Sequence, residues 1–285
     1  MAGTLYIVST PIGNLEDITH RALRTLREVE VIACEDTRHT RKLLNHFGID
    51  RRTISYHEHN ESERADELRA MLAAGKDVAL VSDAGTPLIS DPGFRIVQLA
   101  IEGGFRVLPI PGATAFVAAL SASGLPSDQF LFAGFLPSRG SARRTKLDAL
   151  RSIEATLIFY EAPHRIAATL RGALDVLGDR QAVVARELTK LHEEFVRGTL
   201  SQLAETFSDG SKARGEFVLM ISGERAADDL KRPESTAAAL AERVGQLERE
   251  GLDQKAALKK AARELVLKRD EAYRLILAQK NRRSK

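Results

Sequence analysis

Cysteine and aromatic residues are scarce in this sequence. The single cysteine, Cys34, excludes an intramolecular disulfide and any zinc site built from several thiolates. Aromatic residues make up only 5% of the 285 residues and tryptophan is absent, so the composition does not favour a platform that stacks unpaired bases. No segment approaches the roughly 18 uninterrupted apolar residues of a membrane span, and no signal peptide is recognisable. We therefore expect a soluble, cytoplasmic protein.

The common nucleotide-phosphate signatures are also missing. A phosphate-binding loop of the form G-x-x-x-x-G-K-[ST] is absent, because the only Gly-Lys pair, Gly75-Lys76, continues to Asp77. The first strand-like run leads into STPIGN, where Gly13 is the only glycine, so the dinucleotide fingerprint G-x-G-x-x-G is absent as well. Phosphoryl transfer and ordinary dinucleotide binding are both disfavoured.

Length and charge distribution suggest more than one domain. A chain of this length with 44% hydrophobic residues favours two or more α/β domains. The net charge of +3 is uneven: residues 231–285 hold 15 Lys and Arg against 8 Asp and Glu, and the rest of the chain is slightly acidic. This basic end predicts docking of a polyanion such as nucleic acid, although ordinary exposed helix faces would also be rich in Lys and Arg.

Strand-like and helix-like patterns alternate strictly in residues 1–113. Runs such as LYIVS, VEVIA and DVALVS are separated by helical patterns, for example over residues 61–74. This alternation predicts right-handed βαβ units and a largely parallel sheet in an amino-terminal α/β domain. Asp91 followed by Pro92 predicts a helix start, with Asp91 as the N-cap.

A second α/β domain is expected over residues 114–224, followed by a helical tail. Strands here also follow one another directly, which predicts a mixed sheet. Residues 225–234 have the composition of a linker, and residues 235–285 fit three short basic helices. The last two resemble a helix-turn-helix whose reading helix would carry Arg269, Tyr273 and Arg274, but a three-helix cap that only packs on its neighbour is an equal alternative.

Three glycine- and proline-rich loops follow predicted strands. They read STPIGNL, SDAGTPLISDPG and PIPGATAFVAALSASGLP. In open α/β sheets ligands bind beyond the carboxyl ends of the strands, where turns expose backbone to the ligand. With Asp91 assigned to the helix cap, Asp83 is left as the carboxylate that faces a ligand.

These loops, with the segments VIACEDTRHTRKLL, FLPSR, FYEAPHRI, ARELTKLHEE and GEFVLMI, carry a family resemblance. The sequence resembles the bacterial 16S ribosomal RNA cytidine 2′-O-methyltransferase family of the tetrapyrrole-methylase (class III) superfamily, almost continuously over residues 4–126 and then over most of the chain. The first loop departs from the glycine-rich G-x-G-x-G common in the superfamily. Its form, S-T-P-I-G, matches the ribosomal RNA branch and argues against porphyrin methylation.

The resemblance implies a homodimer that holds S-adenosylmethionine in a cleft between two α/β domains and methylates a decoding-centre cytidine, cytidine 1402, in 16S rRNA of the small ribosomal subunit. It implies that Asp83, Ala84 and Gly85 hold the methionine end of the cofactor and that Ile89 borders the sulfonium. The other positions that it assigns to the cofactor pocket are Pro11, Thr114, Ala115, Tyr160, Ala185 and Phe217.

Methyl transfer to a ribose hydroxyl needs alignment and a proton acceptor, and it requires no metal. The candidate general bases are Glu35 and Asp36 from the first domain and Glu187 from the second; each could instead serve an ion pair or a helix cap. Phosphate contacts are expected from arginines in loops and helix starts at the rim of the cofactor cleft: Arg38, Arg41, Arg139, Arg143 and Arg144. His57 and His59 share one strand face, but no third metal ligand is evident.

Two other functions remain open from the sequence. A small-molecule methylase acting on a tetrapyrrole would share the fold and the cofactor, but it gives no role to the basic tail. A DNA-binding regulator would use the carboxy-terminal helices and treat the α/β part as a ligand sensor. The density of ligand-binding loops at strand ends favours RNA methylation over both.

Overall fold

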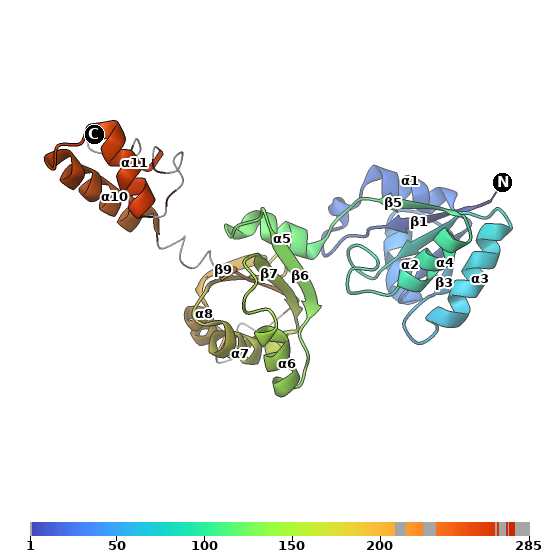
Figure 1. Ribbon diagram of the computed structural model, residues 1–285. Coiled ribbons are helices and arrows are strands. Elements are labelled where there is room, and N and C mark those ends of the chain that lie inside the picture. The colour runs from blue at the N-terminus through green and yellow to red at the C-terminus, as the bar shows by residue number, and fades with distance from the viewer. Residues whose placement is uncertain are drawn as a thin grey trace. The chain divides into compact units, whose positions relative to one another are not determined.

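The computed structural model describes residues 2–208, 215–224, 232–265, 267, 272 and 274–276 (Figure 1). By their internal contacts the residues form two compact units, Met1–Ser222 and Gly223–Lys285. The first unit contains two five-stranded sheets. Among the described residues, no helix is long and apolar enough to cross a membrane.

The first sheet is entirely parallel, as predicted. Its strands are β1 (Thr4–Val8), β2 (Val31–Cys34), β3 (Arg52–Ser55), β4 (Val78–Val81) and β5 (Arg106–Ile110). They are ordered β3-β2-β4-β1-β5. Pro109 lies in β5 at the edge of the sheet, a position that tolerates the missing backbone N–H of proline.

Helices cover both faces of this sheet because its strands are apolar on both sides. The helices are α1 (His20–Glu28), α2 (Thr37–His46), α3 (Glu61–Ala73) and α4 (Phe94–Glu102). In β4, Val78 and Leu80 pack in the cluster that contains α3 and α4, whereas Ala79 and Val81 pack in the cluster that contains α1 and α2. Alternate residues of a strand point to opposite faces, so an unbroken apolar run needs cover on each.

The predicted helix start at Asp91 is wrong. Helix α4 begins at Phe94, and its N-cap is Gly93, with φ at 139°. Side chains rarely adopt such a φ, and a Cβ on Gly93 would lie 2.7 Å from Cδ2 of Leu80. The turn at Gly93 therefore separates Asp91 from the helix and leaves its carboxylate available for another role.

The second sheet is mixed, also as predicted. Its strands are β6 (Phe130–Phe135), β7 (Thr156–Glu161), β8 (Gln181–Arg186), β9 (Glu194–Thr199) and β10 (Phe217–Ile221). The order is β6-β7-β10-β8-β9; the β6–β7 pair is parallel and the other pairs are antiparallel. On one face pack α6 (Gly140–Asp148), α7 (Ile166–Leu177) and α8 (Leu200–Thr206), and on the other packs α5 (Ala115–Ser123) (Figure 1). Short 3-10 turns occupy Leu15–Asp17 and Pro163–Arg165.

The loop after β1 joins the two sheets. Ile12, in that loop, is buried in the same apolar cluster as Leu188, Val218 and Met220 of the second half. The two halves therefore share a core. The domain boundary near residue 113, between 1–113 and 114–224, stays a prediction.

The second unit is helical. Helices α10 (Arg232–Arg249) and α11 (Gln254–Glu264) enclose an apolar cluster that includes Leu240, Leu247 and Ala261. Asp253 caps α11 by accepting the backbone N–H groups of residues 255 and 256. Helix α10 begins within residues 225–234, the range predicted as a linker. The helix-turn-helix stays a prediction.

Candidate functional site

Strands β1 and β4 lie side by side, but the chain leaves them in opposite directions. From β1 it crosses to β2 on one side, and from β4 it crosses to β5 on the other. Ligands of open α/β sheets bind beyond the carboxyl ends of strands at such a switch point. The loops there, residues 9–13 and 82–93, are tied together: the N–H of Thr10 donates to the carbonyl of Gly85 at 2.8 Å, and the reciprocal bond is 3.1 Å long.

The loop after β4 is strained next to this crevice. Gly85 has φ at 87°, which glycine adopts without steric cost. Leu88 and Ser90 have φ at 72° and 66°, in the left-handed region that non-glycine residues rarely enter. Strained backbone of this kind concentrates at functional sites, where the surrounding structure holds it in place.

A cavity of about 380 Å³ opens at this crevice, within the range of small-molecule sites. Eight of the ten residues that the family resemblance assigned to the cofactor line it. They are Asp83, Ala84, Gly85, Ile89, Thr114, Ala115, Tyr160 and Phe217. The cavity therefore collects residues from the loops after β1, β4 and β5 together with residues of the second sheet.

The second sheet contributes its part of the wall through antiparallel pairing. Because β10 runs antiparallel to β7, Phe217 at the start of β10 pairs with Glu161 at the end of β7. This register brings Tyr160, near the end of β7, and Phe217, at the start of β10, to the same end of the sheet. Burial raises the pKa of Tyr160 to about 12, so its phenol keeps its proton at neutral pH.

The other two assigned positions lie outside this cavity. Pro11 lines a neighbouring cavity. Ala185 is completely buried in the apolar cluster between the sheets and lines neither cavity.

Carboxylates dominate the charge of the first cavity. Asp83, Asp91, Glu161 and Glu216 line it, against the single ammonium group of Lys190 among the described residues. Burial raises the pKa of Asp91, and the neighbouring charges of Asp83 and Glu216 raise it further. Glu161 is buried and compensated, because it pairs with Arg165 at 3.1 Å and accepts a hydrogen bond from Thr169 at 2.6 Å. The excess of negative charge suits a cationic ligand.

The sequence reasoning missed Asp91, Lys190 and Glu216 as cavity residues. Asp91 was assigned to a helix cap that the structure does not form. Lys190 lies four residues beyond the end of β8 and Glu216 precedes the start of β10, and the antiparallel pairing of β8 with β10 brings them to the same end of the sheet.

A second cavity, of about 310 Å³, adjoins the first. The two share five lining residues: Ile12, Asp83, Ala84, Lys190 and Glu216. The second cavity is otherwise lined by the loop after β1 and by residues of α2, including His39 and Lys42. Two adjoining cavities with a common wall provide room for two ligands that meet.

The three candidate bases line neither cavity in the described residues. Asp36 caps α2 and forms an ion pair with Arg38 at 2.7 Å. The hydrogen bond from Arg38 holds the pKa of Asp36 well below its usual range, which makes its carboxylate a weak base. Burial raises the pKa of Glu35, with smaller contributions from the charges of Asp83 and Asp91. Glu187 accepts a hydrogen bond from Lys190 at 3.0 Å.

The arginines expected at the rim are exposed or half-exposed, but the structure does not bring all of them together. Arg38 and Arg41 lie on α2, beside the second cavity. Arg139, Arg143 and Arg144 lie at the start of α6, and Arg143 donates to the carbonyls of residues 137 and 138. Arg274 is exposed in the second unit, and Arg269 lies outside the described residues.

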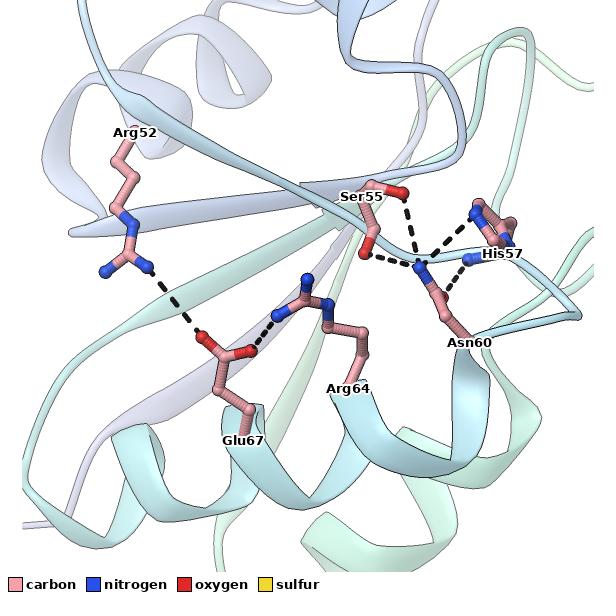
Figure 2. Close-up of polar contacts among 6 residues, drawn as sticks. All are labelled: Arg52, Ser55, His57, Asn60, Arg64 and Glu67. Carbon is pink, nitrogen blue, oxygen red and sulfur yellow. Dashed lines mark hydrogen bonds and ion pairs between the residues drawn. The ribbon is translucent and has the colours of Figure 1, made fainter.

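The prediction that His57 and His59 share one strand face is wrong, because β3 ends at Ser55 and both residues follow it. Figure 2 shows His57 and Asn60 turned toward one another; the Asn60 amide Nδ2 lies 3.3 Å from Nε2 of His57 and donates to the carbonyl of Ser55 at 3.2 Å. In the same view Arg52 and Arg64 both approach Glu67. Over the described part of the chain, no three His, Cys, Asp or Glu side chains gather as metal ligands.

Comparison with known proteins places the chain in a family. Residues 4–204 match the family model of the tetrapyrrole (corrin/porphyrin) methylases. The proteins named ribosomal RNA small subunit methyltransferase I are similar along the sequence. The one from Micromonospora olivasterospora is 54% identical over 222 residues, which is 78% of this chain and 71% of that protein. The one from Synechocystis sp. is 49% identical over 276 residues, which is 96% of this chain and 98% of that protein.

Solved structures show the same fold at low identity. A diphthine synthase superposes with a TM-score of 0.59 at 19% identity, covering 77% of this chain and 90% of its own. A uroporphyrin-III C-methyltransferase from Thermus thermophilus, in complex with S-adenosyl homocysteine, superposes with a TM-score of 0.54 at 20% identity, covering 77% and 97%. The solved structures show the fold alone, whereas the match to the family model and the identity of about 50% to the curated relatives show the family. The chain belongs to the tetrapyrrole methylase family and, within it, to the group of ribosomal RNA small subunit methyltransferase I.

Proposed function

We propose that the protein transfers the methyl group of S-adenosylmethionine to the ribose 2′-hydroxyl of a decoding-centre cytidine in 16S rRNA. The observation that carries this proposal is the coincidence of two findings. Relatives of about 50% identity are named ribosomal RNA small subunit methyltransferase I, and a cavity of ligand size lies at the switch point of the first sheet.

The first cavity fits the proposed cofactor. S-adenosylmethionine carries a sulfonium and an ammonium group, and four carboxylates against one lysine line the cavity. Ile12 and Ile89 supply apolar wall for its aliphatic and adenine parts. The start of α5 offers the backbone N–H groups of a first helical turn for its polar ends. The residues present therefore match the chemistry of this group.

The chain's part in the transfer is to align the hydroxyl, exclude water and accept a proton. The ribose 2′-oxygen forms a bond to the methyl carbon, the carbon–sulfur bond breaks with its electron pair on sulfur, and the hydroxyl proton passes to a carboxylate. Glu35 and Glu187 stay candidates for that carboxylate, and Asp36 is the weakest of the three because it is ion-paired. Asp83 and Glu216, which line both cavities, join the candidates.

The basic carboxy-terminal unit is proposed to dock ribosomal RNA. Residues 231–285 carry a net charge of +7. Lys255, Lys259 and Arg263 lie four residues apart on α11, and all three side chains are exposed. This spacing aligns them on one face of the helix, where they can contact successive phosphates.

We also propose that the protein acts as a homodimer. Large apolar side chains are exposed on α4, α5 and β6; Phe94 and Ile101 on α4 are 71% and 63% exposed, and Val117 on α5 is 51% exposed. Strands β5 and β6 also form edges of their sheets. Exposed apolar residues and unpaired strand edges are features of surfaces that another chain covers.

The test of the function is transfer of labelled methyl from S-adenosylmethionine to purified small ribosomal subunits, naked 16S rRNA and a porphyrin. Digestion of the RNA to nucleosides identifies the product. Label in 2′-O-methylcytidine is expected and shows which RNA form is the substrate. Label only in the porphyrin would replace the proposal with a small-molecule methylase, and label in neither would refute methyl transfer.

A further inference from the structure

We propose that the second cavity is the subsite for the nucleotide that is methylated, and that Lys190, at the junction of the two cavities, is a catalytic residue that donates a hydrogen bond to the reacting 2′-oxygen. This inference rests on the proposed function. It adds an RNA subsite and a residue that the sequence reasoning did not single out.

The first cavity is lined by more acidic residues and the second by more basic residues, as a cofactor site and an RNA site would require. The first cavity has four carboxylates, of which Glu161 is paired with Arg165, and one ammonium group. The second has two carboxylates, Asp83 and Glu216, together with His39, Lys42 and Lys190. A cationic cofactor fits the first set, and an anionic nucleotide with its flanking phosphates fits the second.

Helix α2 extends this basic character from the cavity to the surface. Between Thr37 and His46 it contains three cations, Arg38, Arg41 and Lys42, and no acidic residue. His39 and Lys42 are exposed and line the cavity, and Arg41 donates to Thr53 at the edge strand β3. A strand of RNA lying along α2 would therefore meet cations on its way to the subsite.

Lys190 is held at the junction by an unusual segment of backbone. Glu187 and Thr189 have φ at 49° and 64°, both in the left-handed region. The N–H of Thr189 donates to Glu193 at 2.7 Å, and the N–H of Lys190 donates to the carbonyl of Glu187 at 3.0 Å. Such a conformation persists only where neighbouring structure fixes it, and it concentrates at functional sites.

The loop after β1 packs directly against this segment. A Cβ on Gly13 would lie 2.6 Å from Cγ of Lys190, 2.9 Å from Oγ1 of Thr189 and 3.1 Å from the carbonyl of Leu188. Glycine is therefore the residue that lets the side chain of Lys190 reach the shared wall of the cavities. A larger residue at position 13 would displace the lysine.

The ammonium group of Lys190 is oriented by two carboxylates. It lies 3.0 Å from Oε1 of Glu187 and 3.9 Å from Oε2 of Glu216, and its side chain is 35% exposed. During transfer the 2′-oxygen gives up its proton to one of the candidate carboxylates as its bond to the methyl carbon forms and the carbon–sulfur bond breaks. Negative charge that develops on this oxygen is stabilised by a cation already in place.

The first experiment compares cofactor binding with RNA kinetics. The His39→Ala/Lys42→Ala double variant changes residues that line only the second cavity, and Ala115→Val narrows only the first. The double variant is expected to raise KM for small ribosomal subunits about tenfold and to leave the Kd of S-adenosylhomocysteine within about twofold of wild type. Ala115→Val is expected to raise the Kd of S-adenosylhomocysteine and to leave KM for small ribosomal subunits nearly unchanged. Equal effects of both variants on KM and Kd would overturn the division into two subsites.

The second experiment tests Lys190 itself. Lys190→Met is expected to lower kcat on the order of 100-fold with little change in the Kd of S-adenosylhomocysteine, and Lys190→Arg is expected to restore part of the rate. Gly13→Ala should reproduce the kcat loss while it retains lysine. An unchanged kcat in Lys190→Met, or equal loss in Met and Arg variants, would remove the catalytic role.

A crosslinking experiment gives a readout that does not depend on activity. A benzophenone amino acid at Leu15, which lines the second cavity and is 38% exposed, is expected to crosslink RNA of the small subunit. The matched control is Ala70, which is exposed on α3 and lines neither cavity. Crosslinking that is no stronger at Leu15 than at Ala70 would overturn the subsite. If wild type methylates no RNA, the proposed function fails instead.

Discussion

Replacing Asp83 with asparagine tests the cofactor site without removing its framework. One oxygen of Asp83, Oδ1, accepts the backbone N–H of Asp36 at 3.1 Å, so this side chain supports the first turn of α2 as well as lining the cavity. Asparagine keeps an oxygen for that N–H and removes only the negative charge. Alanine removes both, which leaves the N–H of Asp36 without its acceptor.

The two substitutions should therefore separate binding from stability. Loss of a hydrogen bond to a charged partner costs about 1.5–3 kcal/mol, which corresponds to a rise in Kd of roughly 10- to 150-fold. We expect that rise for S-adenosylmethionine in both variants. The free energy of unfolding should change little in Asp83→Asn, but it should fall by about 1–3 kcal/mol in Asp83→Ala.

Titration calorimetry and denaturant unfolding measure the two quantities. S-adenosylhomocysteine serves as a second ligand because it lacks the sulfonium charge but keeps the amino group. If Asp83 holds the methionine end, as the resemblance implies, both ligands should lose the same factor in affinity. Wild-type affinity for both ligands in Asp83→Asn would refute the assignment of this carboxylate to the cofactor.

Four further predictions follow from single features. Burial raises the pKa of Asp91, so the ionised form of this side chain destabilises the folded state above that pKa. Asp91→Asn should therefore raise the thermal midpoint at pH 7. Thermal melts over a pH series should show this gain shrinking as the pH falls through the raised pKa. Deletion of residues 232–285 should raise KM for small subunits and leave the Kd of S-adenosylhomocysteine unchanged; an unaltered KM would exclude RNA docking by this unit. Ile101→Asp should shift the dimer toward monomer in analytical ultracentrifugation, and an unchanged mass would show that α4 is not part of the interface. Gly85→Ala should lower the free energy of unfolding by about 1–2 kcal/mol, measured in denaturant, because φ is 87° and a Cβ would lie 3.3 Å from Ile12.

Much of the fold was accessible from the sequence because its signals are local. Strands such as Val78–Val81 are buried on both faces and therefore appear as unbroken apolar runs, whereas directly successive strands indicated the mixed second sheet. The strand-end rule located the loop after β4 and its carboxylate Asp83 because parallel strands place their carboxyl ends at one end of the sheet. The resemblance assigned Ala84 and Gly85 to the cofactor. The resemblance supplied the residues from the second half, such as Tyr160 and Phe217.

Tertiary structure decided what depends on contacts between distant segments. The sequence around Asp91 has the form of a helix N-cap, but the turn at Gly93 moves the helix start and leaves this carboxylate in the cavity. Lys190 and Glu216 lie 26 residues apart and meet only because β8 and β10 pair antiparallel. Local propensity sets strands, helices and turns, but cavities form where register and packing bring several strand ends together. The sequence by itself therefore determined the α/β architecture and one loop of the site, and the packing of the two sheets determined the second cavity and the residue at its junction.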